Sequence, residues 1–286
     1  RIDLLNELKK SKLIGQTTDG KKIYLYDYTE DSIVLKELGR LRELSFRKVG
    51  EGVNKKRDTD KYDIYYQHII LWDENDLEIV GSYRIGNSDF IFKNIGVKGF
   101  YSNNLFKYNE EFTPYLKSSI ELGRSFVQPK YWGTRALDYL WFGIGAYLKS
   151  NPNIKYMFGP VSMSASFPTV AKDMMIFYYS HYFKEEVNLV EGKTPYQYSN
   201  NISEIKELFD LEDKKKGFKF LKSALSNIGV TVPTLYKQYS EITEDGGIKF
   251  LSFNIDKNFG DCIDGFILVE VDKIKDSAKK RYIDKE

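Results

Sequence analysis

Cysteine and histidine are scarce in this 286-residue chain, and each shortage excludes a class of site. The single cysteine, Cys262, cannot form an internal disulfide, and it lies near Asp261 and Asp264 rather than in the basic surroundings that activate a thiolate. The two histidines, His68 and His181, are too few for a histidine-rich metal site. The apolar neighbours of His68 are typical of a core histidine. We therefore expect no metal site and no cysteine nucleophile.

Excess charge and long apolar runs are also missing. A formal net charge of +2 is too small to indicate a nucleic acid as the partner. No apolar run has the length of a bilayer span, and no signal-peptide pattern opens the chain. We expect a cytoplasmic location, with peripheral contact to the inner membrane as a further expectation. Because the chain begins with an arginine, we also expect it to be a processed or excised part of a longer protein.

Aromatic residues, by contrast, are abundant. They make up 15% of the chain, and 42% of all residues are hydrophobic, which is enough for a substantial core. Aromatic side chains line pockets for long apolar ligands, but they fill cores more often.

Hydrophobic periodicity predicts an α/β fold with a mixed central sheet flanked by helices. Strands are expected at 22–26, 66–72, 78–85, 120–127, 156–159, 249–254 and 265–271, and helices at 32–49, 137–148 and 233–242. Residues 66–85 should form an antiparallel hairpin. Residues 1–30 are expected to form an N-terminal segment or linker with the first strand, and 31–286 the main domain. Within it, the polar, lysine-rich stretch at about 184–230 is typical of an insertion before the last helix.

A strand, a glycine turn and a helix follow one another between Ile120 and Ser150. Gly133 permits a tight turn, and the unpaired amides of the following helical turn suit an anion such as the phosphate of a phosphopantetheine arm. Gly143 and Gly145 lie inside that helix at a cost of about 1 kcal/mol each, which indicates a close neighbour. We favour tight helix-on-strand packing over contact with a ligand.

Charged residues cluster before and within the predicted hairpin. A calcium loop is excluded because its glycine position is occupied by Asp63, so we expect an ion-pair network among Arg42, Asp60, Asp63 and Arg84. Such networks are more often structural than catalytic.

Glu121 and Arg124 stand three apart on a predicted strand and should point to opposite faces. A bulge at Gly123 would bring both to one side and free a backbone amide for an oxyanion. Alternatively, Arg124 pairs with a carboxylate across the sheet, and spacing does not decide between the two.

The densest basic run comprises Lys214, Lys215, Lys216, Lys219 and Lys222. Such a run is usually a solvated face. The alternative is a docking surface for an acidic carrier protein or an anionic lipid.

Several motifs gain meaning from their order and spacing: Arg42 with Phe46; Asp60, Asp63 and His68; Val80-Gly81-Ser82-Tyr83-Arg84; Glu121-Leu122-Gly123-Arg124-Ser125; Pro129-Lys130-Tyr131-Trp132-Gly133-Thr134-Arg135-Ala136; Pro233-Thr234-Leu235-Tyr236-Lys237-Gln238-Tyr239; and Asn254-Ile255-Asp256 with Phe259. Together they resemble the ornithine-lipid and glycine-lipid N-acyltransferases of the GNAT superfamily, once loosely labelled hemolysins. Acyl-homoserine lactone synthases are more distant relatives. The first thirty residues and Val49-Gly50-Glu51-Gly52 are most similar to a branch fused to a lysophospholipid-type acyltransferase domain. The resemblance therefore implies a fused or partner O-acyltransferase domain.

The resemblance implies a GNAT-like fold and transfer of a 3-hydroxylated fatty acyl group to the amine of glycine or ornithine, in aminolipid biosynthesis, without a bound cofactor. The donor would be acyl carrier protein or acyl-CoA. Lys130 and Arg135 depart from the residues usual in the GNAT loop, which favours the carrier protein.

Physical requirements then distribute the roles. A base must take a proton from the amine, with Glu121 as first choice and Asp63 as second, and Tyr239 is placed to protonate the departing thiolate. Substrate-binding residues are expected to be Arg42, Phe46, Asp60, His68, Arg84 and Arg124, where an arginine would hold the amino acid's carboxylate. Phosphopantetheine would contact Val127, Gln128, Gly133, Thr134, Arg135 and Ala136.

Two competing interpretations remain at this level. The product could be an acyl-homoserine lactone, or the chain could be a non-catalytic module that binds lipid or carrier protein.

Overall fold

A central sheet organises the computed structural model, which describes residues 1–284. Its strands are β1 (Lys12–Gln16), β2 (Lys22–Tyr26), β3 (Gln67–Asp73), β4 (Glu78–Asn87), β6 (Ser119–Val127), β7 (Tyr156–Met163), β9 (Ile248–Asp256) and β10 (Cys262–Glu270). They lie in the order β1-β2-β3-β4-β6-β7-β10-β9, and every neighbouring pair is antiparallel except β6 and β7. A second sheet pairs β5 (Phe106–Tyr108) with β8 (Val190–Gly192).

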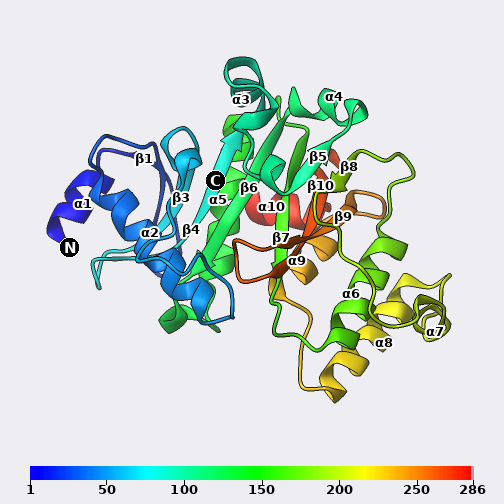
Figure 1. Ribbon diagram of the computed structural model, residues 1–286. Coiled ribbons are helices and arrows are strands. Elements are labelled where there is room, and N and C mark those ends of the chain that lie inside the picture. The colour runs from blue at the N-terminus through cyan, green and yellow to red at the C-terminus, as the bar shows by residue number, and fades with distance from the viewer. Residues whose placement is uncertain (285–286) are drawn as a thin grey trace.

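Helices cover both faces of the central sheet (Figure 1). They are α1 (Ile2–Leu8), α2 (Ile33–Arg47), α3 (Ser88–Asn94), α4 (Thr113–Leu116), α5 (Ala136–Ser150), α6 (Thr169–Tyr182), α7 (Ile202–Glu207), α8 (Lys214–Asn227), α9 (Thr234–Ile242) and α10 (Asp276–Tyr282). The mixed sheet flanked by helices confirms the predicted fold class. Between residues 1 and 284, no helix combines the length and apolar character needed to cross a bilayer.

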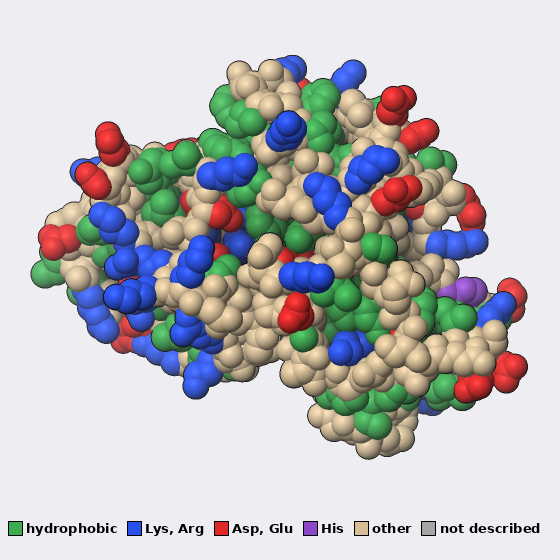
Figure 2. Space-filling model, in the orientation of Figure 1, with side chains coloured by type: hydrophobic (Ala, Val, Ile, Leu, Met, Phe, Trp, Pro, Cys, Tyr) green, Lys and Arg blue, Asp and Glu red, His purple; other side chains and the backbone are tan. Residues whose placement is uncertain are grey.

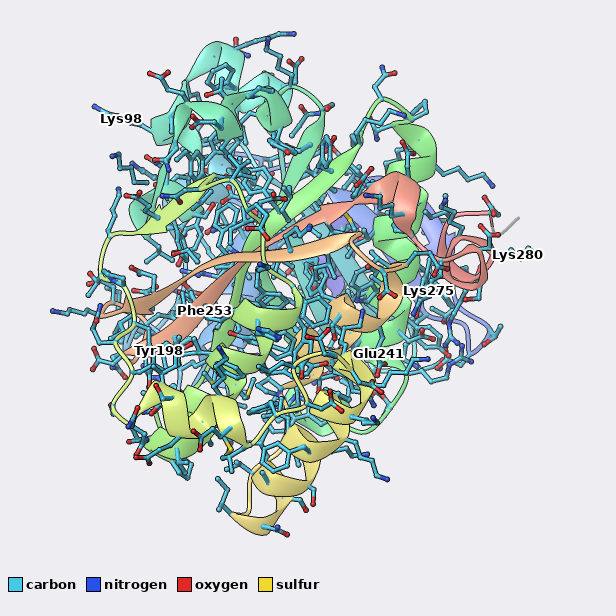
Figure 3. The ribbon with its side chains drawn as sticks, turned by 90° about the vertical axis from the view of Figure 1, so that its right-hand side faces the viewer. Lys98, Tyr198, Glu241, Phe253, Lys275 and Lys280 are labelled. Atoms are coloured by element: carbon cyan, nitrogen blue, oxygen red, sulfur yellow. The ribbon has the colours of Figure 1, made fainter. Side chains whose placement is uncertain are left out.

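Successive side chains of each strand point to opposite faces of the central sheet, so each face packs against its own hydrophobic core. Ile69 and Leu71 of β3 belong to the cluster that packs on α5, whereas Ile70 and Trp72 belong to the cluster under α2. A third cluster, rich in aromatic residues, lies beneath α3, α4 and β5. Figure 3 shows β9 and β10 crossing between this segment above and α6 to α8 below. As expected, most of the abundant aromatic residues fill cores.

The glycines of α5 are explained by close packing. A Cβ atom at Gly143 would lie 2.5 Å from the Cγ2 atom of Ile69, and one at Gly145 would lie 1.8 Å from the carbonyl oxygen of Tyr282. The first contact confirms helix-on-strand packing. The second shows that the C-terminal helix α10 also presses on α5.

Two expectations about the chain's organisation need revision. The stretch at 184–230 is not simply a polar insertion, because Ile205, Phe209, Leu221 and Leu225 are buried in the core on which α6 packs. Its lysines point outward while an apolar stripe on the same helices packs inward, so composition alone concealed the core positions. The predicted boundary near residue 30 falls between β2 and α2, and β1 and β2 are hydrogen-bonded into the central sheet.

Candidate active site

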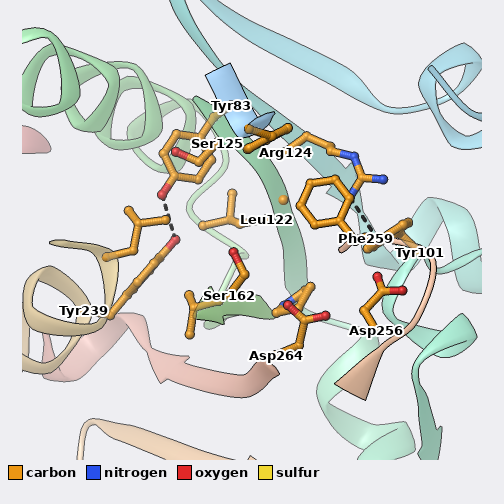
Figure 4. A pocket seen from close by; sticks show the side chains of 15 residues that line it. Tyr83, Tyr101, Leu122, Arg124, Ser125, Ser162, Tyr239, Asp256, Phe259 and Asp264 are labelled. Carbon is orange, nitrogen blue, oxygen red and sulfur yellow. Dashed lines mark hydrogen bonds between the residues drawn. The ribbon is translucent and has the colours of Figure 1, made fainter. Parts of the chain in front are cut away.

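β6 and β7 are paired only along their first residues, and a pocket opens where they part. Their parallel register runs from Ser119 opposite Tyr156 to Glu121 opposite Phe158. At Gly159, where φ is +154°, an added Cβ would lie 2.1 Å from the carbonyl oxygen of Leu122. This close approach requires glycine. The pocket beyond it is partly open to solvent, and about 540 Å³ of space lies between its lining residues when that open solvent is counted (Figure 4).

The two ends of the pocket differ in character. At one end the hydroxyls of Tyr83 and Tyr239 lie 3.3 Å apart. At the other end lie Arg124, Asp256 and Asp264. Burial, reinforced by Tyr83, holds the pKa of Tyr239 well above its usual value, so its hydroxyl keeps its proton.

The predicted bulge in β6 is present, with its strained residue at Arg124. Ser82 pairs with Phe126 but Arg84 pairs with Gly123, so β6 contains one extra residue between these pairs. Arg124 has a φ of 48°, in the left-handed region. The bulge, one of the two alternatives that the spacing left open, brings Glu121 and Arg124 to the same side, where both contact Tyr101.

Arg124 is held rigidly by its surroundings. Its guanidinium lies between the rings of Tyr101 and Phe259, at 4.5 and 4.8 Å from their centroids. Its Nη1 donates to the Tyr101 hydroxyl at 2.9 Å, and its Nε lies 2.9 Å from Asp58 Oδ2. The partner carboxylate therefore comes from the loop before β3 rather than from across the sheet.

The predicted ion-pair network exists and is buried. Asp63 Oδ1 accepts hydrogen bonds from Arg42 Nη1 at 2.8 Å and from Arg84 Nη1 at 3.0 Å. Arg84 Nη1 also donates to Asp60 Oδ1 at 2.7 Å. Burial alone would raise the pKa of Asp63, but the charges of Arg42 and Arg84 outweigh burial and hold that pKa below its usual value.

His68 belongs to the same network. Its Nδ1 lies 3.0 Å from Arg42 Nη2, and its Nε2 lies 3.3 Å from the backbone oxygen of Asp63. Burial, together with Arg42, lowers the pKa of His68 to about 3. It is a neutral core histidine, with no contact to the pocket.

Glu121 lies behind the pocket wall. Its oxygens accept from the backbone amides of Tyr101, at 3.0 Å, and Ser102, at 2.7 Å, and from the hydroxyls of Tyr66 and Ser102. Burial raises its pKa. Of the predicted catalytic and substrate-binding residues, Phe46, Arg124 and Tyr239 line the pocket. Arg42, Asp60, Asp63, His68, Arg84 and Glu121 form the layer behind it.

Two acidic residues of the pocket were not predicted as site residues. Asp256 ends β9, and Asp264 lies on β10 opposite Ser162 of β7. Nearby, Glu51 accepts a hydrogen bond from the Ser162 hydroxyl at 2.9 Å. Burial raises the pKa of all three, that of Glu51 to about 7. A signal was available in the sequence, because Asp264 is the one charged residue in the otherwise apolar run from Cys262 to Val269.

A second groove adjoins the pocket and shares Ser125 and Leu235 with it. Val127, Gly133 and Thr134 of the predicted phosphopantetheine site line this groove. The other three predicted residues do not line it. The Gln128 side chain donates to the backbone oxygen of Ile79, Arg135 pairs with Asp138, and Ala136 is buried.

The lysine run lies on α8 and does not line this groove, and Lys214 and Lys216 pair with Asp245 and Asp210. Within residues 1–284, no three His, Cys, Asp or Glu side chains gather as ligands for a metal ion.

Comparisons with known proteins agree with this architecture. Residues 41–142 match the acetyltransferase (GNAT) domain. The glycine N(alpha)-acyltransferase of Phocaeicola vulgatus is 31% identical over 97% of this chain and 89% of its own length. The L-ornithine N(alpha)-acyltransferase of Rhizobium meliloti is 34% identical over 46% of this chain and 44% of its own.

Among solved structures, the CoA-dependent acyl-homoserine lactone synthase MesI covers 91% of this chain and 92% of its own, with a TM-score of 0.40 and 11% identity. At this level of similarity the likeness supports no statement about activity.

Proposed function

This chain belongs to the family of the glycine N(alpha)-acyltransferases, and on that premise we propose that it transfers a fatty acyl group from a thioester donor to the amine of glycine. The observation that carries the proposal is the pocket between β6 and β7. An apolar donor groove enters it on one side, and a charged acceptor end faces it on the other. We propose glycine rather than ornithine as the acceptor, because the relative named for glycine aligns over nearly the whole chain and the relative named for ornithine over less than half of it.

The thioester of the donor would lie where β6 and β7 separate. Its pantetheine arm would follow the groove past Val127 and Thr134. The first carbons of the acyl chain would point toward a small apolar cavity that continues between β6 and β7 and is lined by Leu122, Met157 and Ile267. Backbone amides of the bulged segment 123–126 are the proposed donors to the oxyanion.

Chemistry at the carbonyl carbon requires three events. The amine nitrogen forms a bond to that carbon, the carbonyl oxygen becomes an oxyanion, and the carbon–sulfur bond then breaks to release a thiolate. Tyr239 is the proposed proton donor to the thiolate, because its hydroxyl lines the pocket and stays protonated. Arg124, fixed between two rings, is the proposed partner of glycine's carboxylate.

A carrier protein is the proposed source of the acyl group. Lys48, Lys55 and Lys56 are exposed and lie with Arg47 on the outer side of α2 and the loop after it. Figure 2 shows Lys and Arg side chains gathered over this part of the surface. The adjoining Val49 lines the donor groove, so an acidic carrier bound here would present its arm to the groove. This surface adjoins a residue that lines the groove, whereas the lysine run of α8 contributes no residue to the groove's lining.

The test is product identification. Purified chain is incubated with a 3-hydroxyacyl carrier protein and an equimolar mixture of glycine, ornithine and serine, and products are identified by mass spectrometry. We expect N-acylglycine as the main product. N-acylornithine as the main product would show that the acceptor is ornithine and not glycine. An acyl-homoserine lactone, formed when S-adenosylmethionine is added, would favour the competing function as a lactone synthase. Hydrolysis of the thioester without any acylated amine would refute the proposed acyl transfer.

A further inference from the structure

Asp264 is unusual among the buried carboxylates of residues 1–284. Its side chain is buried, with 5% of the residue exposed, yet no salt bridge from the described part of the chain reaches it. Within residues 1–284, its one hydrogen-bond contact is with the Cys262 thiol, a weak donor that lies 4.0 Å from Oδ1. Burying a carboxyl group without good partners costs free energy, so a buried carboxyl in this state indicates a missing partner.

The carboxyl group of Asp264 faces the acceptor end of the pocket. In Figure 4 it lies beside Ser162 and Asp256, across from Arg124. A free amino acid carries one positive and one negative group, and this end offers one fixed guanidinium and adjacent carboxyl groups. The missing partner of Asp264 is therefore matched by the acceptor's ammonium group.

Glu121 is in the opposite situation. Two backbone amides and two hydroxyls already donate to its oxygens, and it contacts the loop at Tyr101 rather than the pocket. That arrangement suits a positioning residue that fixes the Tyr101 ring beneath Arg124.

Building on the proposed function, we propose that Asp264 is the group that binds the acceptor's ammonium and takes its proton. The ionised carboxylate accepts one proton from nitrogen, and the nitrogen lone pair then attacks the thioester carbon. After the carbon–sulfur bond breaks, the thiolate takes a proton from Tyr239, which is restored by the second proton lost from nitrogen. The products are amide, thiol and the proton that Asp264 returns to solvent.

The surroundings of Asp264 tune this exchange. Burial, with the nearby charges of Asp256 and Glu51, raises its pKa, while Arg124 opposes the rise. Titratable neighbours on the packed elements are Asp256, Glu51, Arg124, Tyr101, Cys262 and Tyr236. A pKa raised toward the working pH makes the ionised carboxylate a better acceptor for an ammonium proton, and the positive charge of the bound ammonium favours that ionised form.

The experiment compares two acceptors that differ in protonation. Glycine carries an ammonium group at pH 7, whereas aminooxyacetate offers a carboxylate with an amine that is already neutral. We expect Asp264→Asn to lower kcat/KM for glycine by at least about 100-fold, because a general base contributes about that much, and to change kcat/KM for aminooxyacetate by less than about fivefold. Asp261→Asn, at an exposed residue with positive φ, is the matched control and should leave both unchanged.

Several outcomes would overturn the assignment. The first is that Asp264→Asn keeps its kcat/KM for glycine within about threefold of the wild type. The second is that it loses kcat/KM for both acceptors equally. The third is that Glu121→Gln shows the loss that is selective for glycine. Because retained turnover of aminooxyacetate also reports folding, Asp264→Ser replaces the asparagine variant if the latter melts below the assay temperature. A wild-type chain that forms no N-acylglycine would refute the proposed function itself, which separates the two failures.

Discussion

Replacing Asp63 with asparagine should destabilise the protein strongly. Its carboxylate is 1% exposed and compensates two buried guanidiniums, those of Arg42 and Arg84, at 2.8 and 3.0 Å. Asp63→Asn leaves both cations without that charge. Removal of one partner from a buried ion pair costs about 3–5 kcal/mol. For a chain of this size such a loss lowers Tm by about 6–15 °C.

The pH dependence gives a second readout of the same carboxylate. The charges of Arg42 and Arg84 hold the pKa of Asp63 in the fold below the usual aspartate value of about 3.9. Its contribution is therefore complete well above pH 4 and is lost as pH falls through and below that value. The wild type should lose more stability than Asp63→Asn when urea unfolding at pH 7 is compared with unfolding near pH 3.5.

Asp60→Asn is the matched control for this prediction. Asp60 also contacts Arg84, at 2.7 Å, but its side chain is 23% exposed. Its loss should cost about 1 kcal/mol or less, as for a solvated pair. A cost below about 1 kcal/mol for Asp63→Asn would refute the reasoning, and an equal cost for both variants would show that burial does not set the magnitude.

Four further predictions follow from other contacts. Gly145→Ala places a methyl group against a backbone carbonyl of α10 and should cost about 1–3 kcal/mol in thermal or urea unfolding; an unchanged Tm would contradict that packing. His68 has a pKa of about 3 in the fold, so wild-type stability should fall by about 2 kcal/mol from pH 6.5 to 5, and His68→Gln should flatten that slope. Tyr239→Phe should lower kcat by roughly 10- to 100-fold with little change in Tm, and full activity would remove it from proton transfer. Exchanging Lys55 and Lys56 for glutamate should raise KM for an acyl carrier protein roughly tenfold while KM for acyl-CoA stays constant; an equal effect on both donors would place the carrier elsewhere.

Local patterns predicted most of the elements because each strand carries its own alternation. The hairpin of β3 and β4 and the strand-turn-helix unit of β6 and α5 appear where the sequence placed them. Elements that depend on distant partners were harder to see. The short strand β8 is stabilised by pairing with β5, more than eighty residues earlier in the chain. The helix α10 packs against α5 at Gly145.

The candidate site shows the same division. The network around Asp63 was predictable, because a cluster of opposite charges signals locally. The glycine in the strand suggested the bulge as one of two alternatives, and the structure decides for it, with the strained residue at Arg124. Which residues line the pocket could not be predicted, because this depends on the point at which β6 and β7 separate. Glu121 and Asp264 are both carboxylates on apolar strands, and only the tertiary structure shows that one is enclosed by donors while the other faces the pocket.

The most direct test of the account uses labelled acceptor and a single turnover. The chain is mixed in excess with 3-hydroxyhexadecanoyl carrier protein and ¹⁵N-glycine, and thiol release and the label are followed together. We predict one equivalent of free thiol on the carrier and one equivalent of ¹⁵N in an amide-linked acylglycine. Thiol release that is independent of glycine, with the label remaining in the free amino acid, would contradict the proposal that this protein transfers an acyl group to glycine.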